Sequence, residues 1–131
     1  MEWATRLLLG LGGVTAIMLS IAILFLPGPF YASYGIEVEG ATALLNELKA
    51  PALVILTLGA VQVMGVFRKQ ERQGALGAGL LLYLGFGSAR LVALATDGAP
   101  PLSLQAVLVF ELIVGLLFLL AYVRNRTWPA G

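Results

Sequence analysis

The chain has 131 residues, of which 60% are hydrophobic and only 11% are charged, and its formal net charge is +1. Since a soluble domain carries about a quarter charged residues, this composition indicates an integral membrane protein. The chain has no cysteine and no histidine, which excludes disulfides, thiolate metal sites and imidazole proton shuttles. We therefore expect no metal and no cofactor. We expect no nucleic-acid partner either, because the basic residues do not gather with aromatic ones.

Four apolar blocks follow one another along the chain, at residues 7–26, 44–67, 74–96 and 102–123. Each is long enough to cross ~30 Å of hydrocarbon at ~1.5 Å per residue. We therefore predict an all-α, polytopic membrane protein in which residues 1–131 form a single four-helix transmembrane bundle. The first block is longer than the ~7–15 apolar residues of a signal peptide, so we expect it to be retained as a span.

The distribution of basic residues predicts the orientation of these spans. Lysine and arginine are lacking from the links at 27–43 and 97–101, which carry only acidic charges. By the positive-inside rule, both termini should face the cytoplasm of a bacterial inner membrane, with Trp128 at its interface. The basic residues on the cytoplasmic side are then Arg6, Arg68, Lys69, Arg72, Arg124 and Arg126.

Two further features concern the shape of the bundle. The link at 27–43 is predicted to carry a short interfacial helix or turn, with Tyr31 and Tyr34 at headgroup depth. Glycines in the first and third spans predict close helix packing, because they let backbones approach in lipid. An alternative for Gly85 and Gly87 is close approach of a ligand. The packing glycines are Gly10, Gly12, Gly13, Gly74, Gly77, Gly79, Gly85 and Gly87.

All ionisable groups inside the spans fall in the predicted outer half of the bilayer. Lys49 lies near the start of the second span and is expected to extend to water. Glu47 follows Asn46 at the start of that span, where a carboxylate suits the helix dipole. A second role for Glu47, in a polar cluster with the deeper charges Arg90 and Glu111, stays equally open.

Arg90 and Glu111 are predicted to form an ion pair. Arg90 lies six residues, or ~9 Å, below Thr96, and Glu111 lies nine residues, or ~14 Å, into the last span. Side chains tilt toward the N-terminus of their helix, so on antiparallel neighbours Arg90 leans inward and Glu111 leans outward. Because a central arginine costs ~2.5–3.5 kcal/mol on insertion scales, an internal partner is expected. The pair should face the bundle interior and has the groups for bidentate contact.

Tyr83 and Asp97 extend this pair along one face of the third span, because both are spaced by seven residues from Arg90. Asp97 also begins the turn sequence DGAPP, in which Gly98 is the expected helix terminator. Asp97 therefore has two open roles, as a turn residue and as a group that covers the cluster.

The motifs NELKA at 46–50 and GFGSARLVALATDGAPP at 85–101, with the isolated Glu111, resemble a family of small bacterial four-span membrane proteins known only as a domain of unknown function. The family is distantly similar to DoxX-like bundles. Lys49 and Pro51 depart from its pattern. The resemblance covers most of the chain after about residue 40 and implies one functional cluster, with no established activity. The predicted binding cluster is Asn46, Glu47, Tyr83, Arg90, Asp97 and Glu111.

Three functions remain open on the sequence alone. A binding or accessory subunit is favoured, holding a lipid-like, quinone or isoprenoid ligand among membrane lipids or docking in a homo-oligomer or larger complex. The second is a membrane enzyme in which Glu47, Glu111 and Asp97 move a proton on an apolar substrate, as in double-bond isomerisation. The third is an oligomeric transporter, for which the spans lack a clear midplane break.

Overall fold

The computed structural model describes residues 2–127, which are helical almost throughout and contain no strand. This confirms the predicted all-α fold. Within this part of the chain, four helical stretches are long and apolar enough to cross a membrane: Glu2–Phe25, Thr42–Phe67, Lys69–Asp97 and Leu102–Thr127. Trp128, expected at the interface, lies outside the described residues. The elements in order are α1 (Glu2–Phe25), α2 (Pro27–Ala32), α3 (Thr42–Phe67), η1 (Lys69–Glu71), α4 (Arg72–Gly79), η2 (Leu80–Leu84), α5 (Gly85–Asp97) and α6 (Leu102–Thr127).

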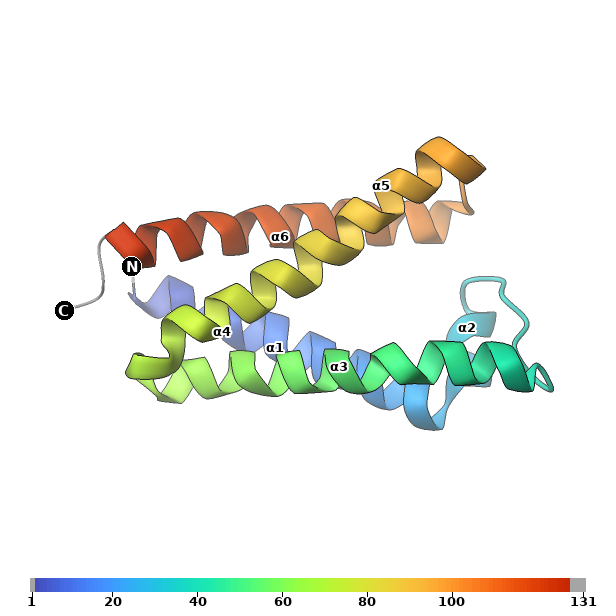
Figure 1. Ribbon diagram of the computed structural model, residues 1–131, viewed down its shortest axis with the longest axis horizontal. Helices are drawn as coiled ribbons and strands as arrows, with labels where there is room; N and C mark the ends of the chain where they lie inside the picture. The colour runs from blue at the N-terminus through green and yellow to red at the C-terminus, as the bar shows by residue number, and fades with distance from the viewer. Residues whose placement is uncertain (1, 128–131) are drawn as a thin grey trace.

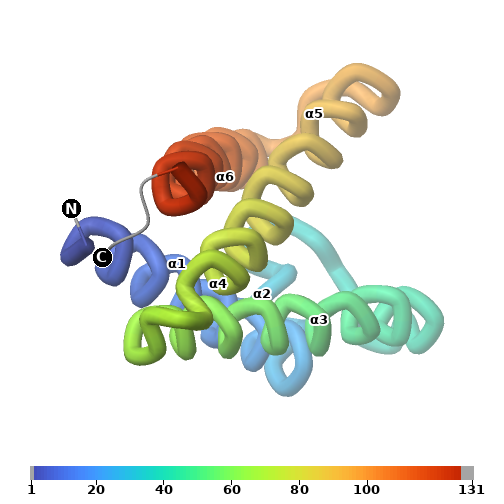
Figure 2. The backbone as a smooth tube through the Cα atoms, turned by 60° about the vertical axis from the view of Figure 1, so that its left-hand side comes forward, coloured from blue at the N-terminus to red at the C-terminus, as the bar shows by residue number. Residues whose placement is uncertain are grey.

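The long helices form two pairs that meet at one end of the molecule. Helix α1 packs along α3, and α5 packs on α6, while α4 contacts both α3 and α6 (Figure 1). Both described ends of the chain lie at the end where α4 sits, which we call the terminal end. Helix α2 and the α5–α6 link lie at the other end, which we call the α2 end. Toward the α2 end, α5 turns away from α3 (Figure 2).

Glycines set the close approaches between these helices. A Cβ on Gly13 would lie 2.8 Å from the carbonyl oxygen of Gly59, so α1 and α3 touch through their backbones. A Cβ on Gly79 would lie 2.1 Å from the ring of Phe118, which is fully buried. The packing prediction therefore holds at these positions and at Gly12 and Gly87. Four other expected glycines have room for a side chain, namely Gly10, Gly74, Gly77 and Gly85.

The third stretch departs from a regular helix at its middle. Residues Leu80–Leu84 form a π-helical turn between α4 and α5, a feature that often marks functional sites. This turn lies against α6, where a Cβ on Gly115 would come within 2.8 Å of the Leu84 nitrogen. By contrast, α3 continues unbroken through Pro51. The irregular backbone is therefore in the helix that carries Arg90, and no sequence motif predicted it.

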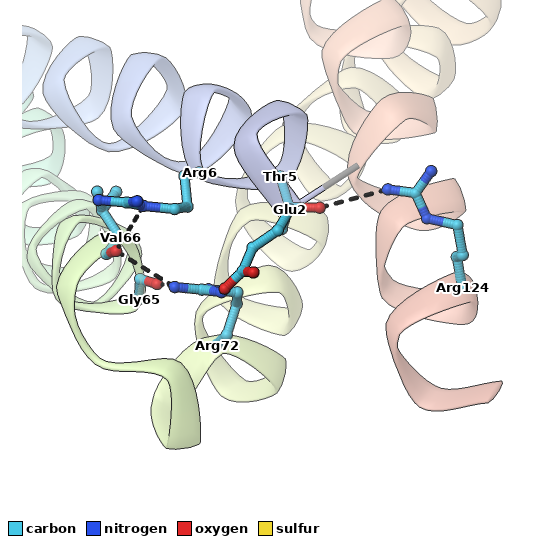
Figure 3. A network of polar contacts seen from close by, with 7 residues as sticks. All are labelled: Glu2, Thr5, Arg6, Gly65, Val66, Arg72 and Arg124. Carbon is cyan, nitrogen blue, oxygen red and sulfur yellow. Dashed lines mark hydrogen bonds and ion pairs between the residues drawn. The ribbon is translucent and has the colours of Figure 1, made fainter. Parts of the chain in front are cut away.

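Arg72 closes the terminal end of the bundle. Its Nε donates to the Gly65 carbonyl at 2.9 Å, and its Nη2 donates to the Val66 carbonyl at 3.3 Å (Figure 3). These are carbonyls of the last turn of α3, which have no partner within the helix. Its Nη1 also binds Glu2 of α1 at 2.7 Å. Arg72, predicted only as one of the basic residues on the cytoplasmic side, is therefore a buried structural residue that ties α1, α3 and α4 together.

Helix α6 joins the same end through three further hydrogen bonds, one of which runs from Gln73 Nε2 of α4 to the Tyr122 carbonyl at 3.3 Å. Arg124 Nη2 donates to Thr5 Oγ1 of α1 at 3.4 Å (Figure 3). Asn125 Nδ2 donates to Gln73 Oε1 of α4 at 2.6 Å. All four long helical stretches are therefore connected by polar side chains at the terminal end.

Candidate functional site

A cavity of about 410 Å³ lies toward the α2 end, between the α1–α3 pair and the α5–α6 pair. Its walls come from α1, α2, the turn after α2, α3, η2, α5 and α6. Most of its lining is aliphatic or aromatic, and its charged lining residues are Arg90 and Glu111. The volume falls in the range of ~300–1,000 Å³ that small-molecule sites occupy.

Arg90 and Glu111 form the predicted ion pair, with Arg90 Nε donating to Glu111 Oε1. The contact is a single hydrogen bond, so the bidentate geometry open to the pair is not adopted. The two partners differ in exposure: the Glu111 side chain is 11% exposed and the Arg90 side chain is 36% exposed. Glu111 is therefore the more buried partner of the pair, and both side chains line the cavity.

The packing of α5 on α6 places these two side chains beside each other. One turn before Arg90, a Cβ on Gly87 would lie 2.8 Å from the side chain of Leu112, the residue after Glu111. Only a glycine therefore lets α6 come this close to α5. Because side chains lean toward the N-terminus of their helix, the antiparallel pair then brings Arg90 and Glu111 together.

Tyr83, on the π-helical turn, forms a fixed part of the cavity wall. Its hydroxyl donates a hydrogen bond to the Gly12 carbonyl of α1. Its ring stacks on Phe118 with centroids 5.6 Å apart and meets the edge of Phe110 at 6.1 Å. The hydroxyl is thus already used to join η2 to α1, and Tyr83 offers the cavity its ring.

Helix α2 adds three aromatic residues to the lining, Phe30, Tyr31 and the following Tyr34. Phe30 meets Tyr31 and Tyr34 edge-on, with ring centroids 5.0 and 5.5 Å apart. Burial raises the pKa of Tyr31, and the charge of Arg90 offsets part of that rise. The predicted short helix is present, and its tyrosines line the cavity with half-buried side chains.

Three members of the predicted cluster lie elsewhere. Asn46 and Glu47 are exposed on the first turns of α3, and Asp97 is exposed at the last residue of α5. None of the three lines the cavity. Gly98, which follows Asp97, has a φ of +91° and ends α5 as expected. The structure therefore brings together Tyr83, Arg90 and Glu111, and leaves the other three apart from them.

Sequence reasoning missed the contribution of α1 and α2 to this site. Thr15 and Leu19 of α1 line the cavity, and nothing in that apolar span distinguishes them from their neighbours. For α2 a signal was available, because Phe30, Tyr31 and Tyr34 share one helix face by their spacing. That signal was interpreted as an interfacial belt.

The chemistry available at the site is hydrogen bonding within an apolar enclosure. Among residues 2–127, no group of three acidic, histidine or cysteine side chains is placed to hold a metal ion. The site presents guanidinium and phenol groups together with several aromatic rings. Such a lining suits a molecule that is mostly apolar and has one polar end.

Comparisons with known proteins identify the family alone. Neither the curated proteins nor the solved structures give a match. The distant similarity to DoxX-like bundles therefore stays a prediction. Residues 4–122, which include the whole cavity lining, match the family model described as Domain of unknown function (DUF4345). The chain therefore belongs to the DUF4345 family.

Proposed function

We propose that this protein is a small integral membrane protein that binds an amphiphilic, lipid-like molecule in the cavity at its α2 end. One observation carries the proposal: an ion pair, Arg90 with Glu111, borders an otherwise largely apolar cavity of about 410 Å³. An arginine within a membrane span is costly and usually marks a functional site. Here the guanidinium would hold the polar end of the ligand, and the apolar walls would take its tail.

The proposal includes an orientation for the bundle. The terminal end carries Arg6, Arg72 and Arg124, whereas the links of the α2 end carry no lysine or arginine. By the positive-inside rule, the terminal end faces the cytoplasm of a bacterial inner membrane and the cavity lies in the outer half of the bilayer. The ligand would then come from the outer leaflet.

This orientation can be tested by cysteine labelling, because the chain has no cysteine of its own. Gln70→Cys and Gly98→Cys place single thiols in the two opposite links. A membrane-impermeant reagent added to intact cells should label Gly98→Cys and spare Gln70→Cys. Labelling of both from the same side would overturn the topology.

The geometry favours binding over proton transfer. An isomerase would need a carboxylate in the cavity that is free to take up and return a proton. Glu111 is held by Arg90, and Glu47 and Asp97 lie outside the lining. No observation favours transport.

The ligand proposal is tested by filling the cavity. Val107 is a half-buried lining residue on α6, whereas Val109, two positions later, is exposed and lies outside the lining. Native mass spectrometry of gently solubilised protein should detect a retained amphiphile in the parent chain and in Val109→Trp. It should be lost in Val107→Trp, because the indole occupies its space. Equal retention in both variants, or none in the parent chain, would contradict the proposal.

A further inference from the structure

We infer that the polar end of the ligand is an uncharged, flat ring that carries a carbonyl oxygen. The inference rests on the proposed function, since it concerns the same cavity. Three properties of the lining lead to it: the charge balance of the ion pair, the accessibility of the Arg90 donors, and the concentration of aromatic side chains.

The charge balance favours an uncharged ligand. Arg90 and Glu111 neutralise each other through a direct contact, and no other charged residue lines the cavity among the described residues. A carboxylate or phosphate bound beside Arg90 would leave one net negative charge in an apolar enclosure. Such a charge is costly to bury unless it is paired. An uncharged head avoids this cost.

The unused donors of Arg90 favour a ligand whose polar end accepts hydrogen bonds. A guanidinium has five N–H donors, and within residues 2–127 Arg90 uses only the one at Nε. Its side chain is about three times as exposed as that of Glu111. Both side chains line the cavity, but the carboxylate is already bound by Arg90 while most donors of Arg90 are unused within the described residues. A carbonyl oxygen matches those donors, whereas a head that can only donate would have to compete with Arg90 for Glu111.

The aromatic lining favours a flat ring. Three of the four tyrosines and three of the six phenylalanines of the chain line this one cavity. Tyr83 is held by its hydrogen bond to Gly12 and by stacking on Phe118, and Phe86 and Phe110 are partly exposed. Aromatic rings attract one another in stacked and edge-on arrangements beyond the burial of area. A conjugated ring ketone or quinone with a hydrocarbon tail combines all three properties.

The experiment compares three probes that share one ring system. Menadione is flat, uncharged and carries two carbonyl oxygens, methylnaphthalene lacks the oxygens, and naphthoic acid is anionic at neutral pH. Each is titrated onto the protein in lipid nanodiscs, and the dissociation constant is taken from the shift in thermal stability. We expect methylnaphthalene and naphthoate each to bind at least about tenfold more weakly than menadione.

Two variants test whether the differences in probe binding depend on the ion pair and on the aromatic lining. Arg90→Met combined with Glu111→Leu removes the donors without leaving a charge unpaired. In this double variant menadione should bind no better than methylnaphthalene. Phe110→Leu, which keeps the ion pair, should weaken both uncharged probes together.

The outcomes separate this inference from the proposed function. Tightest binding of naphthoate would show an anionic head and overturn the inference, and so would equal binding of menadione and methylnaphthalene to the parent chain. If no probe binds while the parent chain retains an amphiphile that Val107→Trp loses, the ring ketone is wrong and the proposed function stands. If the retained amphiphile is also missing, the proposed function itself fails.

Discussion

Two arginines at opposite ends of the bundle have opposite environments. The Arg72 side chain at the terminal end is 5% exposed and donates to Gly65, Val66 and Glu2 (Figure 3). The Arg90 side chain at the α2 end is 36% exposed and makes one hydrogen bond. Among the described residues, Arg72 bonds through all three of its nitrogens and holds helices together, whereas Arg90 bonds through Nε alone and keeps both terminal nitrogens for another partner beside the cavity. The difference separates a structural charge from a candidate binding group.

The backbone shows the same contrast. At the terminal end, α4 contacts both helix pairs, and side-chain hydrogen bonds join all four long stretches. At the α2 end, α5 packs mainly on α6 and turns away from α3 (Figure 1). The space between the pairs there is the cavity. Polar side chains thus join the helix pairs at the terminal end, whereas at the α2 end the cavity lies between them.

The strongest test of the contrast removes the charges at the α2 end. Arg90→Met leaves Glu111 buried without its partner, which should cost about 3–5 kcal/mol of unfolding free energy. Glu111→Leu should cost less, because the remaining guanidinium is partly open to the cavity. The double change should recover part of the loss, since neither charge is left alone. Thermal unfolding in detergent measures all three.

Arg68→Met provides a matched control, because Arg68 is an exposed arginine with no hydrogen bond from its side chain to residues 2–127. It should change stability little. Strictly additive single effects in the Arg90 and Glu111 cycle would mean that the two side chains do not interact.

The second test concerns the terminal end. Arg72→Met removes three charge-assisted hydrogen bonds and leaves the Gly65 carbonyl without its side-chain donor, so we expect a loss of about 2–3 kcal/mol. Glu2→Gln should cost clearly less than Arg72→Met, because half of the Glu2 side chain is exposed and water screens its charge. The ligand retained by the parent chain should survive both changes. Loss of that ligand in Glu2→Gln would mean that the two ends are not independent.

The third test concerns the contact between Gly79 of α4 and Phe118 of α6, which lies between the two ends. Gly79→Ala forces a Cβ against the buried ring of Phe118, and overpacking of this kind typically costs about 1–3 kcal/mol. Gly85→Ala is the matched control, because a Cβ there meets nothing within 4 Å. Its effect should be neutral or slightly stabilising, since alanine is the better helix former. Denaturant unfolding in detergent should separate the two, and equal losses would contradict the assigned packing.

Much of the fold could be predicted because it depends on local properties. A span is recognised from the length of its apolar run, and the Arg90–Glu111 pair from depth and from the direction in which helical side chains lean. The pair was found because both quantities are known for any helix. Asn46, Glu47 and Asp97 were grouped with the pair because they lie in the same half of the bilayer. Position along a helix does not show how far apart two helices lie at their ends. The structure places these three on the exposed ends of α3 and α5.

What could not be predicted depends on contacts between distant segments. Arg72 belongs to the polar run RKQERQ, in which its sequence context does not set it apart from Arg68 and Lys69. Its structural role depends on the free carbonyls at the end of α3, which only the fold brings beside it. The π-helical turn at Leu80–Leu84 lies where α6 brings Gly115 against the backbone of Leu84. The aromatic residues of α2 become lining only because the fold brings α2, α5 and α6 around one cavity. Of these, only the α2 aromatics leave a spacing pattern in the sequence, and that pattern does not show what their shared face contacts.

The smallest expected effect reports on the charge of Arg90 inside the cavity. Burial raises the pKa of Tyr31 above the ordinary value of about 10, so the folded protein holds the phenol proton more tightly than the unfolded chain. Its contribution to stability is present below that value and is lost as the pH rises through the raised pKa. The parent chain should therefore lose more stability on alkaline titration than Tyr31→Phe, with parallel curves at neutral pH. Because Arg90 holds this pKa down, the phenolate absorbance of Tyr31 should appear at higher pH in the Arg90→Met, Glu111→Leu double variant. An unchanged titration there would mean that the guanidinium charge of Arg90 does not reach Tyr31 across the cavity, contrary to the assigned arrangement of the α2 end.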